Sequence, residues 1–289
     1  MRAEVHFLYI LCCNWAGVHW VVSAEKLRSK LLLPVLALSV LSTWLITVTF
    51  QLLLIDIAQT FNVQVGIASM VASVGALSGA LFGLLMAVVS VRFNHKLLLL
   101  AGLGCTCLAA LGFYAAPTFL FILFPNIGVG AGIAIVTAMA YSIVGDQYPL
   151  EKRGRAIGVL VAAFTFAYVI GAPCIGAVAC VTGWQPVMLL LALPFALVSL
   201  ILSLTVIPKR TSNSFTVKEP FLAGCKQAFS QRSTVAALLV TMLMLCESAI
   251  GYYSVTFFRH QFNLSIMDGS YFVLVGNMFQ SKIATLLAA

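Results

Sequence analysis

Glu247 is the residue of this chain most suited to chemistry, because it is an acid inside a long apolar run, residues 235–257. Burying a carboxylate in hydrocarbon costs about 2.5 to 3.5 kcal/mol on insertion scales, so such a group should face a cavity, be protonated, or both. We therefore predict that Glu247 binds a proton or a cationic substrate. The structural alternative is a carboxyl group that hydrogen-bonds to a neighbouring helix.

Further polar side chains inside apolar runs are candidates for lining a central cavity. They are Thr47, Gln51, Asn126, Tyr141, Tyr252 and Tyr253. Each can turn a polar atom inward while its apolar part packs against helices. The alternative for each is a packing role, in which hydroxyl and amide groups hydrogen-bond between helices. Asp56 ends the first apolar run, where we expect a helix cap or an interfacial residue.

These candidates do not form the site that an enzyme, a metal ion or a nucleic acid needs. An intramembrane enzyme requires a nucleophile with its base, paired acids or metal ligands at membrane depth, and Glu247 stands alone there. The four histidines, His6, His19, His95 and His260, lie outside the core apolar runs, and the eight cysteines include no CxxC pair. We predict no metal, no cofactor and no disulfide framework. A net charge of +8 from so few charges is too sparse for nucleic-acid binding.

The composition predicts that membrane-spanning helices position these residues. Hydrophobic residues make up 62% of the chain and charged residues 8%, whereas a soluble domain carries about 25% charged residues. A helix crosses the hydrocarbon core in about 20 residues. Apolar runs near that length cover residues 31–55, 66–90, 97–116, 118–144, 156–181 and 186–207, followed by 235–257 and by a run that begins near Tyr271.

This pattern predicts an all-α polytopic membrane protein. We expect a six-helix amino-terminal bundle over residues 31–207, a cytoplasmic linker over 208–234, and one to two helices of an incomplete second bundle over 235–289. Residues 1–30 contain an apolar run that is too short to span comfortably. Two interpretations stay open for them: a dispensable leader and an interfacial segment.

Basic residues predict the orientation, because lysine and arginine in short loops stay on the cytoplasmic side. Thirteen of them fall before the first run or in every second loop: Lys26, Arg28, Lys30, Arg92, Lys96, Lys152, Arg153, Arg155, Lys209, Arg210, Lys218, Lys226 and Arg232. The opposite loops hold Arg259. We therefore predict a plasma or inner membrane protein whose first span starts in the cytoplasm and whose immediate partner is the lipid bilayer.

Glycines at helical spacing predict close helix packing. Gly75, Gly79 and Gly83 lie four residues apart in the second run, and the fourth run carries Gly128, Gly130 and Gly132. A helix face without side chains lets a neighbouring helix approach at backbone distance.

The segment that begins at Asp146 carries a more specific pattern. It reads Asp146-Gln-Tyr-Pro-Leu-Glu-Lys-Arg153-Gly-Arg155-Ala, then Gly171-Ala-Pro173-Cys-Ile-Gly176, then Gly-Trp184-Gln. This resembles the major facilitator superfamily at the loop between helices 4 and 5 and along helix 5. The helix-5 pattern looks most like the proton-coupled drug and sugar exporters. The resemblance implies gating roles in the cytoplasmic loops for Arg92, Lys96, Asp146, Arg153 and Arg155, and a helix-5 motif formed by Gly171, Pro173 and Gly176.

The chain departs from that family pattern at three positions. Val91 stands where the family's loop between helices 2 and 3 has an aspartate, so Asp146 and Glu151 must supply negative charge or the gate network is weaker. Phe124 stands where many exporters have a proton-coupling arginine, and Gln185 follows Trp184 in place of arginine.

The resemblance implies secondary active transport of a small drug-like or sugar-like solute, exported against protons by alternating access. Pro173 and its glycines allow helix 5 to bend during such a motion, and the alternative is a static kink. A second hypothesis is a truncated, non-transporting membrane half that assembles with a partner half or with a copy of itself.

Overall fold

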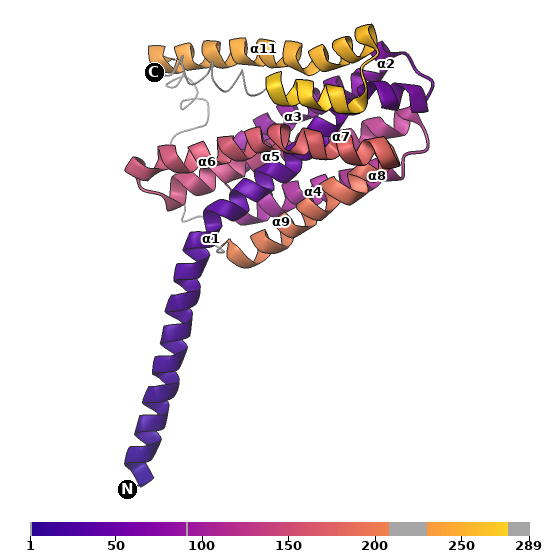
Figure 1. The fold of residues 1–289 in the computed structure, drawn as a ribbon. Helices are drawn as coiled ribbons and strands as arrows, with labels where there is room; N and C mark the ends of the chain where they lie inside the picture. The colour runs from indigo at the N-terminus through magenta and orange to yellow at the C-terminus, as the bar shows by residue number, and fades with distance from the viewer. Residues whose placement is uncertain (1, 91, 208–229, 277–289) are drawn as a thin grey trace.

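The computed structural model describes residues 2–90, 92–207 and 230–276, and in these ranges the chain is all-α, as predicted. The helices are α1 (Arg2–Thr60), α2 (Val65–Ala68), α3 (Met70–Val89), α4 (His95–Tyr114), α5 (Phe119–Gln147), α6 (Leu150–Val169), α7 (Gly171–Thr182), α8 (Trp184–Val187), a π-helical turn (Met188–Ala192), α9 (Leu193–Val206), α11 (Arg232–Phe262) and a last helix, Ile266–Gly276. Figure 1 shows the helices from the second half of α1 to α9 gathered together, with α11 and the last helix along one side.

Six helical segments of the described residues are long and apolar enough to cross a membrane. They are Leu31–Thr60, Val65–Val89, His95–Tyr114, Phe119–Gln147, Leu150–Thr182 and Trp184–Val206. Each contains most of one predicted run, so the prediction of an all-α polytopic membrane protein is confirmed. We call these six segments the first bundle.

The predicted domain boundaries outside the first bundle stay predictions. The seventh predicted run lies inside α11, and the eighth lies in a helix that begins at Ile266, five residues before Tyr271. Residues 208–229 of the predicted linker and residues 277–289 lie outside the described residues. Residues 2–30 are helical and continue into the first span as one helix, α1 (Figure 1). The choice between a leader and an interfacial segment stays a prediction.

Glycines set the position of α5 between α3 and α4. A methyl group at Gly130 would overlap Ser78 Oγ and the Gly75 carbonyl oxygen of α3, and it would lie 2.8 Å from the Gly79 amide nitrogen. On another face of α5, a methyl group at Gly132 would lie 2.5 Å from Thr106 Oγ1 of α4. Gly83 has open space around it, so close packing uses Gly75 and Gly79 of the predicted α3 series.

Hydroxyl pairs join α1 to α9 inside the first bundle. Ser39 Oγ lies 3.3 Å from Ser203 Oγ, and Ser42 Oγ lies 3.2 Å from Ser199 Oγ. All four side chains are buried. Ser39, Ser42 and Ser199 can also donate to carbonyls of their own helices, so small hydroxyl side chains bring α1 and α9 close together without leaving a buried donor unpaired.

The fifth membrane segment, Leu150–Thr182, breaks into α6 and α7 near Pro173. Proline has no backbone donor for the carbonyl four residues earlier, here Val169, and its ring clashes with that carbonyl. α6 ends at Val169, Ile170 has φ −101° and ψ −38°, and α7 begins at Gly171. The chain then turns at Gly183, whose φ of 83° is in the left-handed region that favours glycine.

Candidate transport site

A cavity of about 530 Å³ lies between the first bundle and α11. Its lining comes from α1 (Trp44, Thr47, Phe50), the start of α3 (Val71, Ala72, Ser73, Gly75, Ala76, Gly79), α5 (Asn126, Val129, Gly130, Ile133) and α11 (Tyr252, Tyr253). We call this space the central cavity. Helices far apart in the sequence thus meet around one space.

Close packing of α3 and α5 shapes one wall of the central cavity. The Asn126 amide nitrogen donates a hydrogen bond to the Val71 carbonyl oxygen, and the absence of a side chain at Gly75 makes room for that amide. A methyl group at position 75 would lie 2.9 Å from Asn126 Nδ2. One donor of this predicted site residue therefore holds α5 to α3, while its carbonyl oxygen remains an acceptor.

The lining of the central cavity is apolar and aromatic, with a few hydroxyl and amide groups. Thr47, Ser73, Tyr252 and Tyr253 supply the hydroxyls, and Asn126 supplies the amide. Trp44 is held by Phe164 of α6, with ring centroids 4.6 Å apart in an edge-to-face arrangement. No charged side chain is among the residues described as lining the cavity. The described lining thus combines apolar contact area with a few hydrogen-bonding groups, as small-molecule pockets generally do.

The structure separates the remaining predicted cavity residues. Gln51 is buried, and its Nε2 donates to the Gly251 carbonyl oxygen at 3.2 Å, so it connects α1 to α11. Tyr141 is 39% exposed and does not line the cavity. Glu247 lies in α11, one helical turn before Gly251, and its side chain is outside the described ones. The functional roles of all three stay predictions.

An ion pair that sequence reasoning missed joins α1 to α11. Arg259 Nη1 lies 2.8 Å from Asp56 Oδ2, and its Nη2 lies 3.4 Å from Oδ1. The Arg259 side chain is 6% exposed and that of Asp56 is 24% exposed. One signal was available: Asp56 and Arg259 are opposite charges predicted on the same side of the membrane. We call the end of the bundle that carries this pair the Asp56 end.

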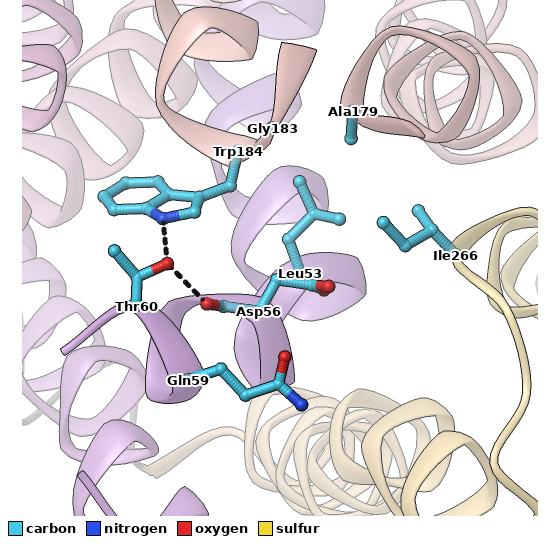
Figure 2. Close-up of a pocket in the computed structure, with 8 residues that line it drawn as sticks. All are labelled: Leu53, Asp56, Gln59, Thr60, Ala179, Gly183, Trp184 and Ile266. Carbon is cyan, nitrogen blue, oxygen red and sulfur yellow. Dashed lines mark hydrogen bonds between the residues drawn. The ribbon is translucent and has the colours of Figure 1, made fainter. Parts of the chain in front are cut away.

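A second cavity of about 380 Å³ has Asp56 of this ion pair in its wall, and Figure 2 shows the residues that line it. It is lined by Leu53, Asp56, Gln59, Thr60, Ala179, Gly183, Trp184 and Ile266. The Trp184 indole nitrogen donates to Thr60 Oγ1 at 3.0 Å, and Thr60 Oγ1 donates to the Asp56 carbonyl oxygen at 2.8 Å. These bonds fix the last turn of α1 against the start of α8.

The predicted gating residues lie at the opposite end of the first bundle, which we call the Lys96 end. Lys96 Nζ donates to the carbonyl oxygens of Leu204 and Ile207, at 2.7 and 2.5 Å, and so satisfies the carboxyl end of α9. Asp146 Oδ2 lies 3.2 Å from His95 Nδ1, a salt bridge when the imidazole is protonated. Asp146 thus meets the first residue of α4, directly after the loop in which Val91 replaces the family's aspartate.

The arginines at the Lys96 end differ in their surroundings. Arg153 Nε donates to the Tyr148 carbonyl oxygen at 2.9 Å, which secures the turn between α5 and α6. Arg92 and Arg155 are exposed. Their gating roles stay predictions.

The helix-5 motif contacts both α1 and the last helix. A methyl group at Gly171 would lie 2.7 Å from Leu45 Cδ2 of α1, and one at Gly176 would lie 3.0 Å from Ser270 Cβ of the last helix. Pro173 sets the break between α6 and α7 described above. The motif therefore lies where the first bundle meets the helices that follow it.

These features define a multi-pass membrane protein whose helices surround a cavity. The sequence matches the Major Facilitator Superfamily over residues 32–288, and the chain belongs to that family. It is 30% identical over 126 residues to the uncharacterized MFS-type transporter YwfA of Bacillus subtilis (strain 168), a match that covers 42% of this chain and 29% of that protein.

Three solved structures share the fold. A bacterial homologue of the human lysosomal transporter Spinster, inward-facing and unoccupied, has a TM-score of 0.63 at 20% identity over 87% of this chain and 60% of that chain. Its occupied form gives 0.58 at 23% identity over 85% and 56% of the two chains. The peptide transporter POT in complex with alafosfalin gives 0.54 at 13% identity over 78% and 50%. The match thus covers 29% of the length of YwfA and 50–60% of the lengths of the three solved structures.

Proposed function

We propose that this chain carries out secondary active transport of small solutes by alternating access, in which two helix bundles rock around a central site. The observation that supports this best is the central cavity, which the first bundle and α11 form together. Its volume of about 530 Å³ lies within the roughly 300–1,000 Å³ of ordinary small-molecule sites. Rocking of α11 against the first bundle would open and close it.

Contacts near the Asp56 end support the closing of that end in one state of the cycle. The Asp56–Arg259 ion pair joins α1 to α11, and Gly176 packs against Ser270 of the last helix. Arg92, Lys96, Asp146, Arg153 and Arg155 are the corresponding candidates at the Lys96 end. If the basic loops are cytoplasmic, the Asp56 end faces the outside.

The finer proposal is proton-coupled export of drug-like or sugar-like compounds. Aromatic walls with scattered hydroxyl and amide groups suit both kinds of compound. Phe124 replaces the arginine that many related exporters use with protons, so Glu247 is our candidate for the proton site. Membrane-embedded acids commonly have such roles.

A second candidate is a membrane half that acts only with a partner. The chain spans 60% of the length of the Spinster homologue, and transport in this family uses two six-helix halves. Assembly with a second half, or with a copy of itself, would then complete the cavity.

Proteoliposome transport with an imposed pH gradient tests these proposals. We would measure gradient-driven movement of chloramphenicol, a neutral aromatic drug, and of glucose, comparing this chain with a version extended to twelve helices. Transport by this chain supports the first candidate, and transport only after extension or co-expression with a second half supports the other. Movement that ignores the pH gradient in the extended version removes proton coupling.

Filling the central cavity should stop transport without unfolding the protein. Ala72→Trp places an indole in the cavity from α3, and we expect at least a tenfold loss of transport rate because the solute and the indole compete for the same space. Leu84→Trp is the matched control, since Leu84 lies on the same helix, is 73% exposed and does not line the cavity. Equal rates for the two variants would show that solute does not pass through this space.

A further inference from the structure

α1 bends at a position where its own sequence gives no reason to bend. Leu53 has φ −105° and ψ 18°, which are not helical values, and the helix kinks there. Sharp kinks occur at proline, at glycine or serine pairs, at π-bulges, or where a side chain inserts into the hydrogen-bond ladder. Residues 35–60 contain neither proline nor glycine.

The inserted side chain belongs to Arg259 of α11. Its Nη1 donates to the Leu52 carbonyl oxygen at 2.6 Å, directly before the kink, while the same guanidinium pairs with Asp56 directly after it. The arginine is 7% exposed, and these contacts pair its two terminal nitrogens, while its buried Nε has no hydrogen-bond partner among the described residues. Its side chain crosses the last helix at Gly269, where a methyl group would lie 2.6 Å from Arg259 Cδ.

We propose that Arg259 is a positioning residue that holds α1 kinked at Leu53 by binding the Leu52 carbonyl. The role of Arg259 in the kink does not depend on the proposed transport function; only its effect on a bound solute rests on that function. When Arg259 leaves, the Leu52 carbonyl loses this donor, and α1 straightens towards a regular helix. The kink therefore exists only while Arg259 binds the Leu52 carbonyl.

The consequence is a link between the Asp56 end and the central cavity. On one side of the kink, Thr47 and Phe50 line the central cavity; on the other side, Asp56 and Thr60 line the cavity of Figure 2. A change of bend at Leu53 alters the direction of one segment relative to the other. Docking of Arg259 at the Asp56 end thus sets how α1 presents Thr47 and Phe50 to a solute.

The test separates the bend of α1 from the docking of α11 by two distances in the full chain. Genetically encoded spin labels at Gln59 and Leu120 form a bend pair within the first bundle, because α1 and α5 both belong to it. Labels at Leu120 and His260 form a docking pair between the first bundle and α11, and neither of them lies on the segment of α1 that the bend moves. The last six residues of α1 span about 9 Å, so removing a kink of at least about 20° moves their end by roughly 3 Å.

Arg259→Met should shift both distances, because it removes the donor to Leu52 and the charge partner of Asp56 together. Asp56→Asn should widen the docking pair only, since Arg259 can still donate to Leu52. In the exchange of Asp56→Arg with Arg259→Asp, the docking pair should recover while the bend pair stays shifted, because a carboxylate cannot donate to a carbonyl.

Thr49→Val is the control for bending caused by a local hydroxyl. Thr49 Oγ1 donates to the Leu45 carbonyl oxygen at 2.9 Å, a bond that can bend a helix one turn before the kink. This variant should leave the bend pair unchanged. The proposal is overturned if Arg259→Met leaves the bend pair within 1 Å of the parent value, or if Asp56→Asn shifts it equally. Both outcomes are measured without any solute, so they are distinct from a failure of the transport proposal. If the exchange variant does not fold, the bend distances of Arg259→Met and Asp56→Asn alone test whether Arg259 holds the kink.

Discussion

Gly130→Ala is expected to lower the apparent melting temperature of the detergent-solubilised protein by roughly 4–8 °C, from a loss of about 2 kcal/mol. The added methyl group would overlap Ser78 Oγ and the Gly75 carbonyl oxygen and would lie 2.8 Å from the Gly79 amide nitrogen. Two of these three atoms belong to the backbone of α3, so no rotation of a side chain can relieve the overlap. The helices α3 and α5 must separate instead.

Gly145→Ala is the matched control for this prediction. Gly145 lies on the same helix, α5, and nothing lies within 4 Å of the position that its methyl group would take. Alanine is also the better helix former by about 1 kcal/mol, so this variant should melt at the parent temperature or slightly above it. Equal melting temperatures for the two variants would contradict the close approach of α3 and α5.

The separation of α3 and α5 in the Gly130→Ala variant should also change the shape of the central cavity. Gly130, Gly79 and Gly75 all belong to its lining, and the Asn126 amide that crosses to Val71 lies beside them. A packing defect at Gly130 therefore changes the wall that a solute contacts. This explains why glycines, which have no chemistry of their own, belong to the candidate site.

The sequence predicts the spans because their signals are local. Apolar runs of bilayer length and the break before Pro173 depend on residues close together in the chain, and the structure has helices over the six predicted runs. The glycine spacing in the second run likewise predicts close packing, but it does not say which glycines use it. Gly79 meets Gly130, whereas Gly83 faces open space, because the direction of each helix face is set by neighbours far away in the sequence.

The site was harder to predict, because it depends on which residues of distant helices meet. Tyr252 lines the central cavity and Tyr141 does not, although both are tyrosines in apolar runs. Asp56 was expected to be a cap or interfacial residue, and its partner Arg259 lies 203 positions away. The kink at Leu53 has neither proline nor glycine near it in the sequence, and the side chain that we propose holds it comes from α11.

Removing both charges of the Asp56–Arg259 pair should cost less than removing one. Asp56→Asn leaves the buried Arg259 without its counter-charge, and breaking a buried pair in this way typically costs about 3–5 kcal/mol. Arg259→Met should cost less than Asp56→Asn, because the Asp56 side chain is 24% exposed and water can reach it. The double variant replaces the ion pair by an apolar side chain and by an amide that water can reach, a change that leaves no buried charge without its partner.

Thermal unfolding of the parent, the two single variants and the double variant forms a double-mutant cycle for this pair. We expect the double variant to melt above Asp56→Asn, with a coupling of at least about 1.5 kcal/mol. Additive losses would show that the two charges do not interact, and the docking of α11 on α1 would then rest on its other contacts, which include the hydrogen bond from Gln51 to Gly251. A coupled result would instead show that each charge alone is costly, while the pair as a whole contributes little to the free energy of unfolding. The main effect of such an ion pair is to select the arrangement of α1 and α11 in which both charges are paired.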